Sequence, residues 1–73
     1  MQNVLGDEIR KERLRAKLTQ EQLAARAGVS RNYVSLLELN EKSPTVKMLF
    51  RLCGVLRVRP SSLVARVEPR ESR

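Results

Sequence analysis

The chain has 73 residues, a length that supports one small domain with a single core and little spare stability. Its 15 Lys and Arg outnumber 8 Asp and Glu, and the net charge of +7 favours a nucleic acid partner, although an anionic membrane or a merely cationic surface would fit the same balance. One cysteine and no histidine exclude an internal disulfide framework and a metal site of ordinary ligand spacing.

The residue types favour helices. Hydrophobic residues make up 41% of the chain and aromatic residues only 3%, so Leu, Val and Ala must build the core. Leu, Ala and the many Glu, Gln, Lys and Arg are helix formers, and no Asn-Gly or Asp-Gly hairpin signal is present. We therefore expect an all-α fold. Without a signal peptide or an apolar run of membrane-spanning length, we also expect a cytoplasmic protein with no membrane partner.

Residues 4–16 form the first predicted helix. Leu5, Ile9 and Arg13 follow each other at intervals of four residues, so they share one face. An arginine in such an apolar stripe either reaches past the core to water or has an acidic partner inside the protein.

A second helix is predicted from residue 19 onward. Thr19, followed three residues later by Gln22, has the form of a capping box. Gly28 stands where a helix ends and the chain turns, and Ser30 is a suitable cap for a third helix. This part of the chain is therefore predicted to be a helix, a turn and a second helix.

The third helix, at about residues 30–39, has two different faces. Val34 and Leu37 are three residues apart and face inward. The outer face has residue types that read base edges in a DNA major groove, since Arg pairs with guanine, Asn with adenine and apolar groups with the thymine methyl. The predicted base-reading residues are Arg31, Asn32, Ser35 and Leu36. Tyr33 either touches a phosphate through its hydroxyl or packs half-buried against the second helix.

Glu38 lies four residues after Val34 and therefore borders the buried side of this helix. A carboxylate there is unfavourable unless it is paired, and Arg13 presents the same problem on the first helix. We therefore predict a salt bridge between Arg13 and Glu38 that ties the first helix to the third.

The fourth helix is predicted at residues 45–56, after a polar turn that ends at Pro44. One face is expected to be buried, and its members are Val46, Leu49, Phe50, Cys53 and Leu56. Cys53 is then a small core residue. Met48 and Val55 lie on the opposite side and are candidates for contact with a partner.

The last predicted helix covers residues 60–66, with Pro60 at its first position. Its apolar residues give it surface that a five-helix monomer need not fully bury. Together with the outer side of the fourth helix, it supplies the predicted dimer interface, which consists of Met48, Val55, Leu63, Val64 and Val67. Residues 1–67 are then the DNA-binding domain, and residues 68–73 are a charged tail that we expect to be disordered.

From residue 9 to about residue 64, the sequence resembles the phage repressor/Cro-like (XRE-type) helix-turn-helix family. The similarity runs through LTQEQLAARAGVS, RNYVSLLE, SPT, LFRL and SSLV. Among small members, the chain is similar to prophage regulators and to the controller proteins of restriction–modification systems. The resemblance implies a compact, lambda-repressor-like bundle of five helices in which the second and third helices form the DNA-binding unit.

The resemblance also implies roles for individual residues. In this family, the first residue of the second helix contacts phosphate and braces the recognition helix, and Gln20 has that position. The family's Arg-to-Glu pair falls on Arg13 and Glu38. The predicted phosphate-binding residues are Gln20, Tyr33, Lys42, Ser43 and Lys47. Asn40 and Arg57 stand where glycine is more usual.

These observations predict a transcriptional regulator that binds double-stranded DNA in a sequence-specific manner. It would act as a homodimer on a palindromic operator, with residues 30–39 in the major groove. The alternative is an antitoxin-type protein that binds a toxin and represses its own promoter. An enzyme is not expected, because the sequence has no histidine, metal site or glycine-rich phosphate loop. No cofactor and no small-molecule effector are predicted.

Overall fold

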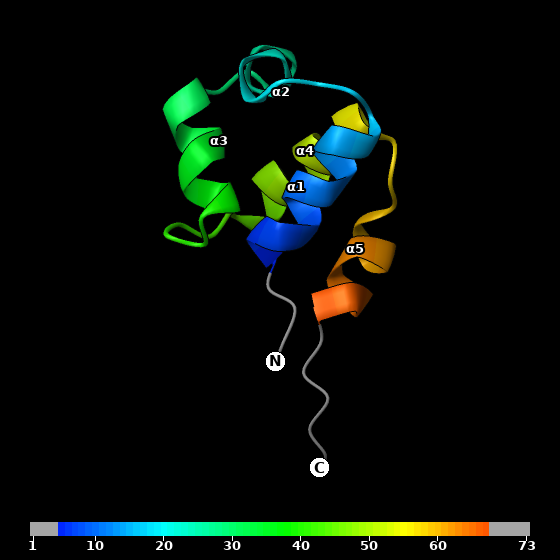
Figure 1. Cartoon of the computed structure of the whole chain (residues 1–73). Helices are drawn as coiled ribbons and strands as arrows, with labels where there is room; N and C mark the ends of the chain where they lie inside the picture. The colour runs from blue at the N-terminus through cyan, green and yellow to red at the C-terminus, as the bar shows by residue number, and fades with distance from the viewer. Residues whose placement is uncertain (1–4, 68–73) are drawn as a thin grey trace.

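The structure, a computed structural model, describes residues 5–67 and folds them into five helices. They are α1 (Leu5–Arg15), α2 (Gln20–Ala27), α3 (Arg31–Glu38), α4 (Val46–Leu56) and α5 (Pro60–Val67). No strand occurs within this range, so the all-α prediction is confirmed. Figure 1 shows α1 between α3 and α5, with α2 across one end of the bundle and α4 behind α1.

Hydroxyl side chains fix the starts of α2, α3 and α4. Thr19 Oγ1 accepts a hydrogen bond from the backbone N of Gln22 at 3.0 Å, and Gln22 Oε1 accepts one from the backbone N of Thr19 at 2.8 Å. The predicted capping box is therefore present. Ser30 caps α3 and Thr45 caps α4 through the backbone N–H three residues further on. A cap of this kind contributes about 1 kcal/mol.

The core lies between the helices and is almost entirely aliphatic. Its largest fully buried side chains are Ile9, Leu23, Val34, Leu37, Leu52, Cys53 and Leu63. Burial raises the pKa of the Cys53 thiol, in keeping with a packing role. Leu63 corrects a prediction, because it was assigned to the dimer interface. Its side chain is fully buried in the core of the monomer and has no exposed surface that could contact a second copy.

Helix α4 presents a different face to the core from the one predicted. Val46 and Phe50 were expected to be buried, but they are 70% and 59% exposed. Leu52 takes the central place in the core instead. Met48 and Val55 were expected to face away from the core, yet both are partly buried and pack against it. The reason is that apolar residues occur all around this helix, so its period does not identify one face.

Left-handed residues follow each of the first four helices. Lys17, Gly28, Asn40 and Arg57 have φ angles of 61°, 74°, 62° and 59°. Only Gly28 has a residue type that adopts this conformation without steric penalty. Asn40 and Arg57 therefore keep the backbone path of a glycine while adding a side chain at the end of α3 and of α4.

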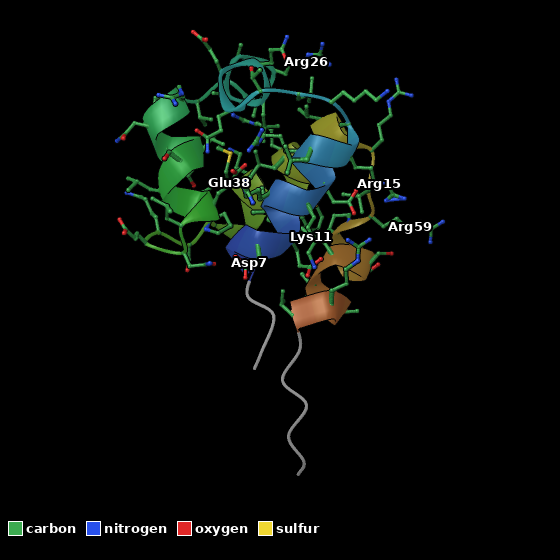
Figure 2. All side chains as sticks on the ribbon, in the orientation of Figure 1. Asp7, Lys11, Arg15, Arg26, Glu38 and Arg59 are labelled. Carbon is green, nitrogen blue, oxygen red and sulfur yellow. The ribbon has the colours of Figure 1, made fainter. Side chains whose placement is uncertain are left out.

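Charged side chains cover much of the outside. In Figure 2, Arg26 and Arg59 extend away from the helices, whereas Glu38 points from α3 toward α1. Among residues 5–67, no helix is long and apolar enough to cross a bilayer. The tail predicted at residues 68–73 lies outside the described part of the chain.

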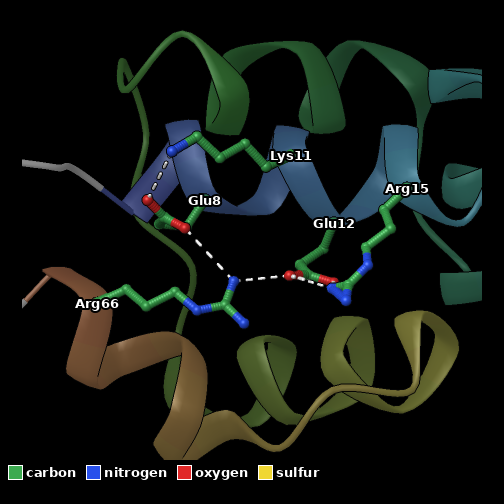
Figure 3. Close-up of polar contacts among 5 residues, drawn as sticks. All are labelled: Glu8, Lys11, Glu12, Arg15 and Arg66. Carbon is green, nitrogen blue, oxygen red and sulfur yellow. Dashed lines mark hydrogen bonds and ion pairs between the residues drawn. The ribbon is translucent and has the colours of Figure 1, made fainter.

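A cluster of charges fastens α5 to α1. Glu8 and Glu12 are one turn apart on α1, and both are buried. Arg66 of α5 places its Nη1 2.6 Å from Glu12 Oε2 and 3.4 Å from Glu8 Oε1 (Figure 3). Lys11 lies 3.4 Å from Glu8, and Arg15 lies 3.5 Å from Glu12. The two buried carboxylates are tolerated because cations face both of them.

This cluster predicts a pH dependence of stability. The hydrogen bond from Arg66 lowers the pKa of Glu12, and burial opposes it only in part. A carboxyl whose pKa is lower in the folded state stabilises the fold above its unfolded-state pKa, near 4.5, and that contribution is lost as the pH falls through the folded-state pKa. We predict that Arg66→Met lowers the free energy of unfolding at neutral pH and flattens its decline in acid.

Urea unfolding followed by circular dichroism, from about pH 7 down to about pH 3, measures this difference. Arg10→Met is the matched control, since it removes the same charge from an exposed position on α1. An Arg66→Met curve parallel to that of the wild type would contradict the assignment.

Candidate nucleic-acid interface

The ion pair predicted between Arg13 and Glu38 is present and joins α1 to the last turn of α3. Arg13 Nε donates a hydrogen bond to Glu38 Oε2 at 2.6 Å, and Nη2 donates to Oε1 at 2.9 Å. The side chains of Arg13 and Glu38 are only 9% and 2% exposed. This two-pronged geometry is the strongest form of Arg–carboxylate contact, and it fixes direction as well as distance.

Two further contacts complete this group. Gln20, the first residue of α2, donates a hydrogen bond from Nε2 to Glu38 Oε1 at 3.0 Å. Arg13 Nη1 donates to the backbone carbonyl of Leu18, in the turn between α1 and α2, at 2.9 Å. Within the described residues, every buried polar side-chain atom has a hydrogen-bond partner. Because the buried charges are satisfied, they hold α1, α2 and α3 at one mutual angle.

Gln20 keeps a donor for a ligand while it holds α3. A side-chain amide nitrogen carries two hydrogens, and the contact with Glu38 uses one of them. The second hydrogen is available to an acceptor at the start of α2, where backbone N–H groups also lack intrahelical partners. This placement is compatible with the predicted phosphate contact.

The outer face of α3 carries the predicted base-reading residues. Arg31 and Asn32 are exposed in its first turn, and Ser35 and Leu36 are partly exposed one turn later. Leu39, just past the end of α3, is exposed and extends the apolar part of this face. The inner face, by contrast, is fully buried, so a ligand can reach α3 from one side only.

Tyr33 and the residues after α3 form the edge of this face. Tyr33 is partly buried and packs against the core, and this placement leaves both of its predicted roles open. Lys42 Nζ lies 5.9 Å from the centre of the Tyr33 ring, a distance at which a cation is attracted to the ring. Ser43 and Lys47 are exposed in the loop and in the first turn of α4. These hydroxyl and ammonium groups suit phosphate oxygens.

Sequence reasoning missed one contact of this region. The sequence shows Asn40 where glycine is more usual, but the Asn40 side chain also accepts a hydrogen bond from the backbone N of Gly6 in α1. The two residues are 34 positions apart, and no local pattern signals their pairing.

No group of His, Cys, Asp and Glu suited to a metal ion occurs among residues 5–67. The exposed side chains of this region offer hydrogen-bonding groups and positive charge.

Comparisons with known proteins agree with this geometry. A family model described as "Helix-turn-helix" matches residues 9–63. The uncharacterized HTH-type transcriptional regulator y4dJ of Sinorhizobium fredii is 38% identical over 64 residues, covering 88% of this chain and 83% of that protein.

Two solved structures are similar as well. The P22 c2 repressor, in complex with a synthetic operator, has a TM-score of 0.79 at 31% identity and covers 84% of this chain and 92% of its own. The restriction–modification controller protein C.AhdI of Aeromonas hydrophila has a TM-score of 0.78 at 29% identity, covering 81% of this chain and 86% of its own.

The buried ion pair predicts a large effect of removing one partner. Glu38→Ala leaves the Arg13 guanidinium buried without a counter-charge, so we expect the free energy of unfolding to fall by about 3–5 kcal/mol. Gln20→Ala removes one hydrogen bond to the same carboxylate and is expected to lower it by only about 1 kcal/mol. Urea unfolding of the wild type and both variants checks the ranking, and equal losses would contradict it.

Proposed function

The chain belongs to the helix-turn-helix family of DNA-binding transcriptional regulators, and we propose that it acts as a homodimer on a palindromic operator. In this proposal, α3 enters the major groove and reads base edges, while the start of α2 and the loop after α3 bind phosphates. The family is not enzymatic, in agreement with the expectation from the sequence.

The observation that carries the proposal is the rigid support of α3. Arg13 and Gln20 both bind Glu38, so the inner side of α3 is fixed, while Arg31 and Asn32 remain exposed on the outer side. A reading helix needs this combination, because base contacts depend on side chains held in one geometry.

Each outer residue has a matching partner in DNA. Arg31 suits guanine, Asn32 suits adenine, Ser35 suits either, and Leu36 suits the thymine methyl group. Around them, the proposed phosphate contacts are Gln20, Tyr33, Lys42, Ser43 and Lys47. The phosphate contacts set the register of the protein on DNA and do not distinguish sequences.

The size of the reading surface supports a dimer. Helix α3 has 8 residues, and four of them face outward as base contacts. Each good base contact gives about 1–3 kcal/mol of discrimination, which selects only a short site. A two-fold symmetric pair reads two half-sites about one helical turn apart, and this doubles the information in the operator.

The proposed dimer surface consists of the exposed sides of α5 and α4. Val64 is 44% exposed, and Phe50 of α4 lies beside a shallow groove of about 440 Å³ that extends to Pro60.

Gly54 lines the same groove, and an added Cβ there would have no atom within 4 Å. The fold therefore does not require glycine at a helix position where alanine would be more stable by about 1 kcal/mol. A glycine at this position would allow the backbone of α4 to lie close to a second copy of the chain. Of the other residues predicted for the interface, Met48 and Val55 are partly buried against the core on the other side of α4, and Val67 is partly buried at the end of α5.

The DNA-reading role predicts different outcomes for two cationic residues. Arg31→Ala is expected to change the sequence preference, because it removes a base contact. Lys47→Ala is expected to weaken binding to all sequences alike and to lower the slope of log affinity against log salt by about 1. In vitro selection from a random DNA pool, followed by titration of the selected and a random duplex at several salt concentrations, measures both effects. The selection also shows whether the site is palindromic. Equal losses on both duplexes for Arg31→Ala would contradict a base-reading role.

The proposed dimer predicts that Val64→Lys forms only monomers. The new ammonium groups would face each other across the two-fold axis, while the exposed position leaves the core unchanged. Leu14→Lys is the matched control, since Leu14 is 51% exposed on α1 outside the proposed surface. Light scattering at micromolar concentration, with and without the selected duplex, should give dimers for the wild type and the control. Monomers for the wild type in both conditions would contradict the proposal.

A further inference from the structure

Asn40 connects the end of the recognition helix to the start of α1. It follows Leu39, the C-cap of α3, and has a left-handed conformation with φ of 62°. Its Oδ1 accepts a hydrogen bond from the backbone N of Gly6 at 2.8 Å, and its Nδ2 donates one to Asp7 Oδ1 at 3.3 Å. The N–H groups in the first turn of a helix have no intrahelical acceptor, so the Asn40 side chain supplies one to α1 from outside.

Gly6 allows the two helices to meet at this place. A Cβ added to Gly6 would lie 2.1 Å from the carbonyl oxygen of Leu37 and 2.5 Å from Asn40 Oδ1. The nearest obstacle is backbone and cannot rotate away, so the first turn of α1 lies directly against the last turn of α3. This contact is separate from the Arg13–Glu38 pair and does not share an atom with it.

Two contacts along α1 therefore hold the last turn of α3. Gly6 and Arg13 are seven residues apart, or about 10 Å along a helix that rises about 1.5 Å per residue. Two points at this separation hold the angle between the helices more tightly than the Arg13–Glu38 pair does alone. Helix α3 has 8 residues and is about 12 Å long, so a tilt of about 5° at its end would shift Arg31 by about 1 Å. Base contacts tolerate only about half of that displacement.

We propose that Asn40 is a positioning residue for DNA recognition, which acts with Gly6 to set the angle of α3 against α1. The inference rests on the reading role proposed for α3. Asn40 itself touches no base in this scheme, and its effect on sequence preference is transmitted through the direction of the helix. Glycine at this position would supply the same backbone conformation. Compared with glycine, Asn40 therefore adds a side chain with two hydrogen bonds, to Gly6 and to Asp7. We call this set of contacts the joint.

Asn40→Gly tests the joint without disturbing the turn. Glycine adopts the left-handed conformation more readily than asparagine, and this gain offsets the two lost hydrogen bonds, so the thermal midpoint should stay close to that of the wild type. The ratio of affinities for the selected and the random duplex should fall about tenfold, equivalent to the loss of roughly one base contact. Affinity for the random duplex should change by less than about twofold, because the phosphate contacts remain.

An exchange of donor and acceptor provides a rescue. Asn40→Asp combined with Asp7→Asn keeps the acceptor for the N–H of Gly6, keeps a hydrogen bond between the two side chains and leaves the net charge unchanged. We expect this double variant to recover most of the affinity ratio. Lys17→Gly is the matched control, because it also replaces a left-handed residue by glycine, here at the end of α1, and it should leave the affinity ratio unchanged.

The outcomes separate the joint from the proposed function. If the wild type selects a common sequence and Asn40→Gly keeps its affinity ratio, the joint is wrong and the reading role of α3 stands. If Asn40→Gly weakens binding to both duplexes equally, Asn40 is a phosphate contact and the joint is wrong. A wild type that selects no common sequence would overturn both proposals.

Discussion

The arrangement of this domain depends on one buried ion pair. Placing Arg13 and Glu38 in a nearly dry site is unfavourable for each charge alone, and the pair is stable only because every hydrogen bond is made. Such a pair tolerates little displacement, so it specifies geometry more than it adds stability. The Gln20 amide extends this requirement to the start of α2. A domain with few core residues thereby obtains a fixed angle for α3 that aliphatic packing alone would define less sharply.

Helix α1 is the structural centre, although it carries none of the proposed DNA contacts. On one side it binds α3 through Arg13 and receives Asn40 at its first turn. On another side its buried acids hold α5 through Arg66. Helix α3, which carries the reading surface, and helix α5, which carries part of the proposed dimer surface, are therefore both held by α1. The spacing of two α3 helices on DNA would then depend on the straightness of α1 and on its two sets of contacts.

Local physics made much of this predictable from the sequence. Helix limits followed from hydroxyl caps, a proline and a glycine, and the Arg13–Glu38 pair followed from two charges on otherwise apolar faces. The orientation of α4 was not predictable in this way. Both Phe50 and Leu52 are apolar, and only the packing of the other helices decides which one is buried. Contacts between distant segments, such as that of Asn40 with α1, leave no periodic trace and could be found only in three dimensions. The base-reading assignments remain predictions.

The left-handed helix ends have a consequence for the lifetime of the protein. Lys17 and Arg57 hold a conformation that is unfavourable for a residue with a side chain by about 1–2 kcal/mol each, and Asn40 holds it at a smaller penalty. In a domain of this size, that is a large share of the total stability. DNA binds only the folded form, and at about one hundred times its dissociation constant it adds about 2.7 kcal/mol. DNA binding would therefore lengthen the lifetime of the folded form, because a chain that opens less often is cleaved less often.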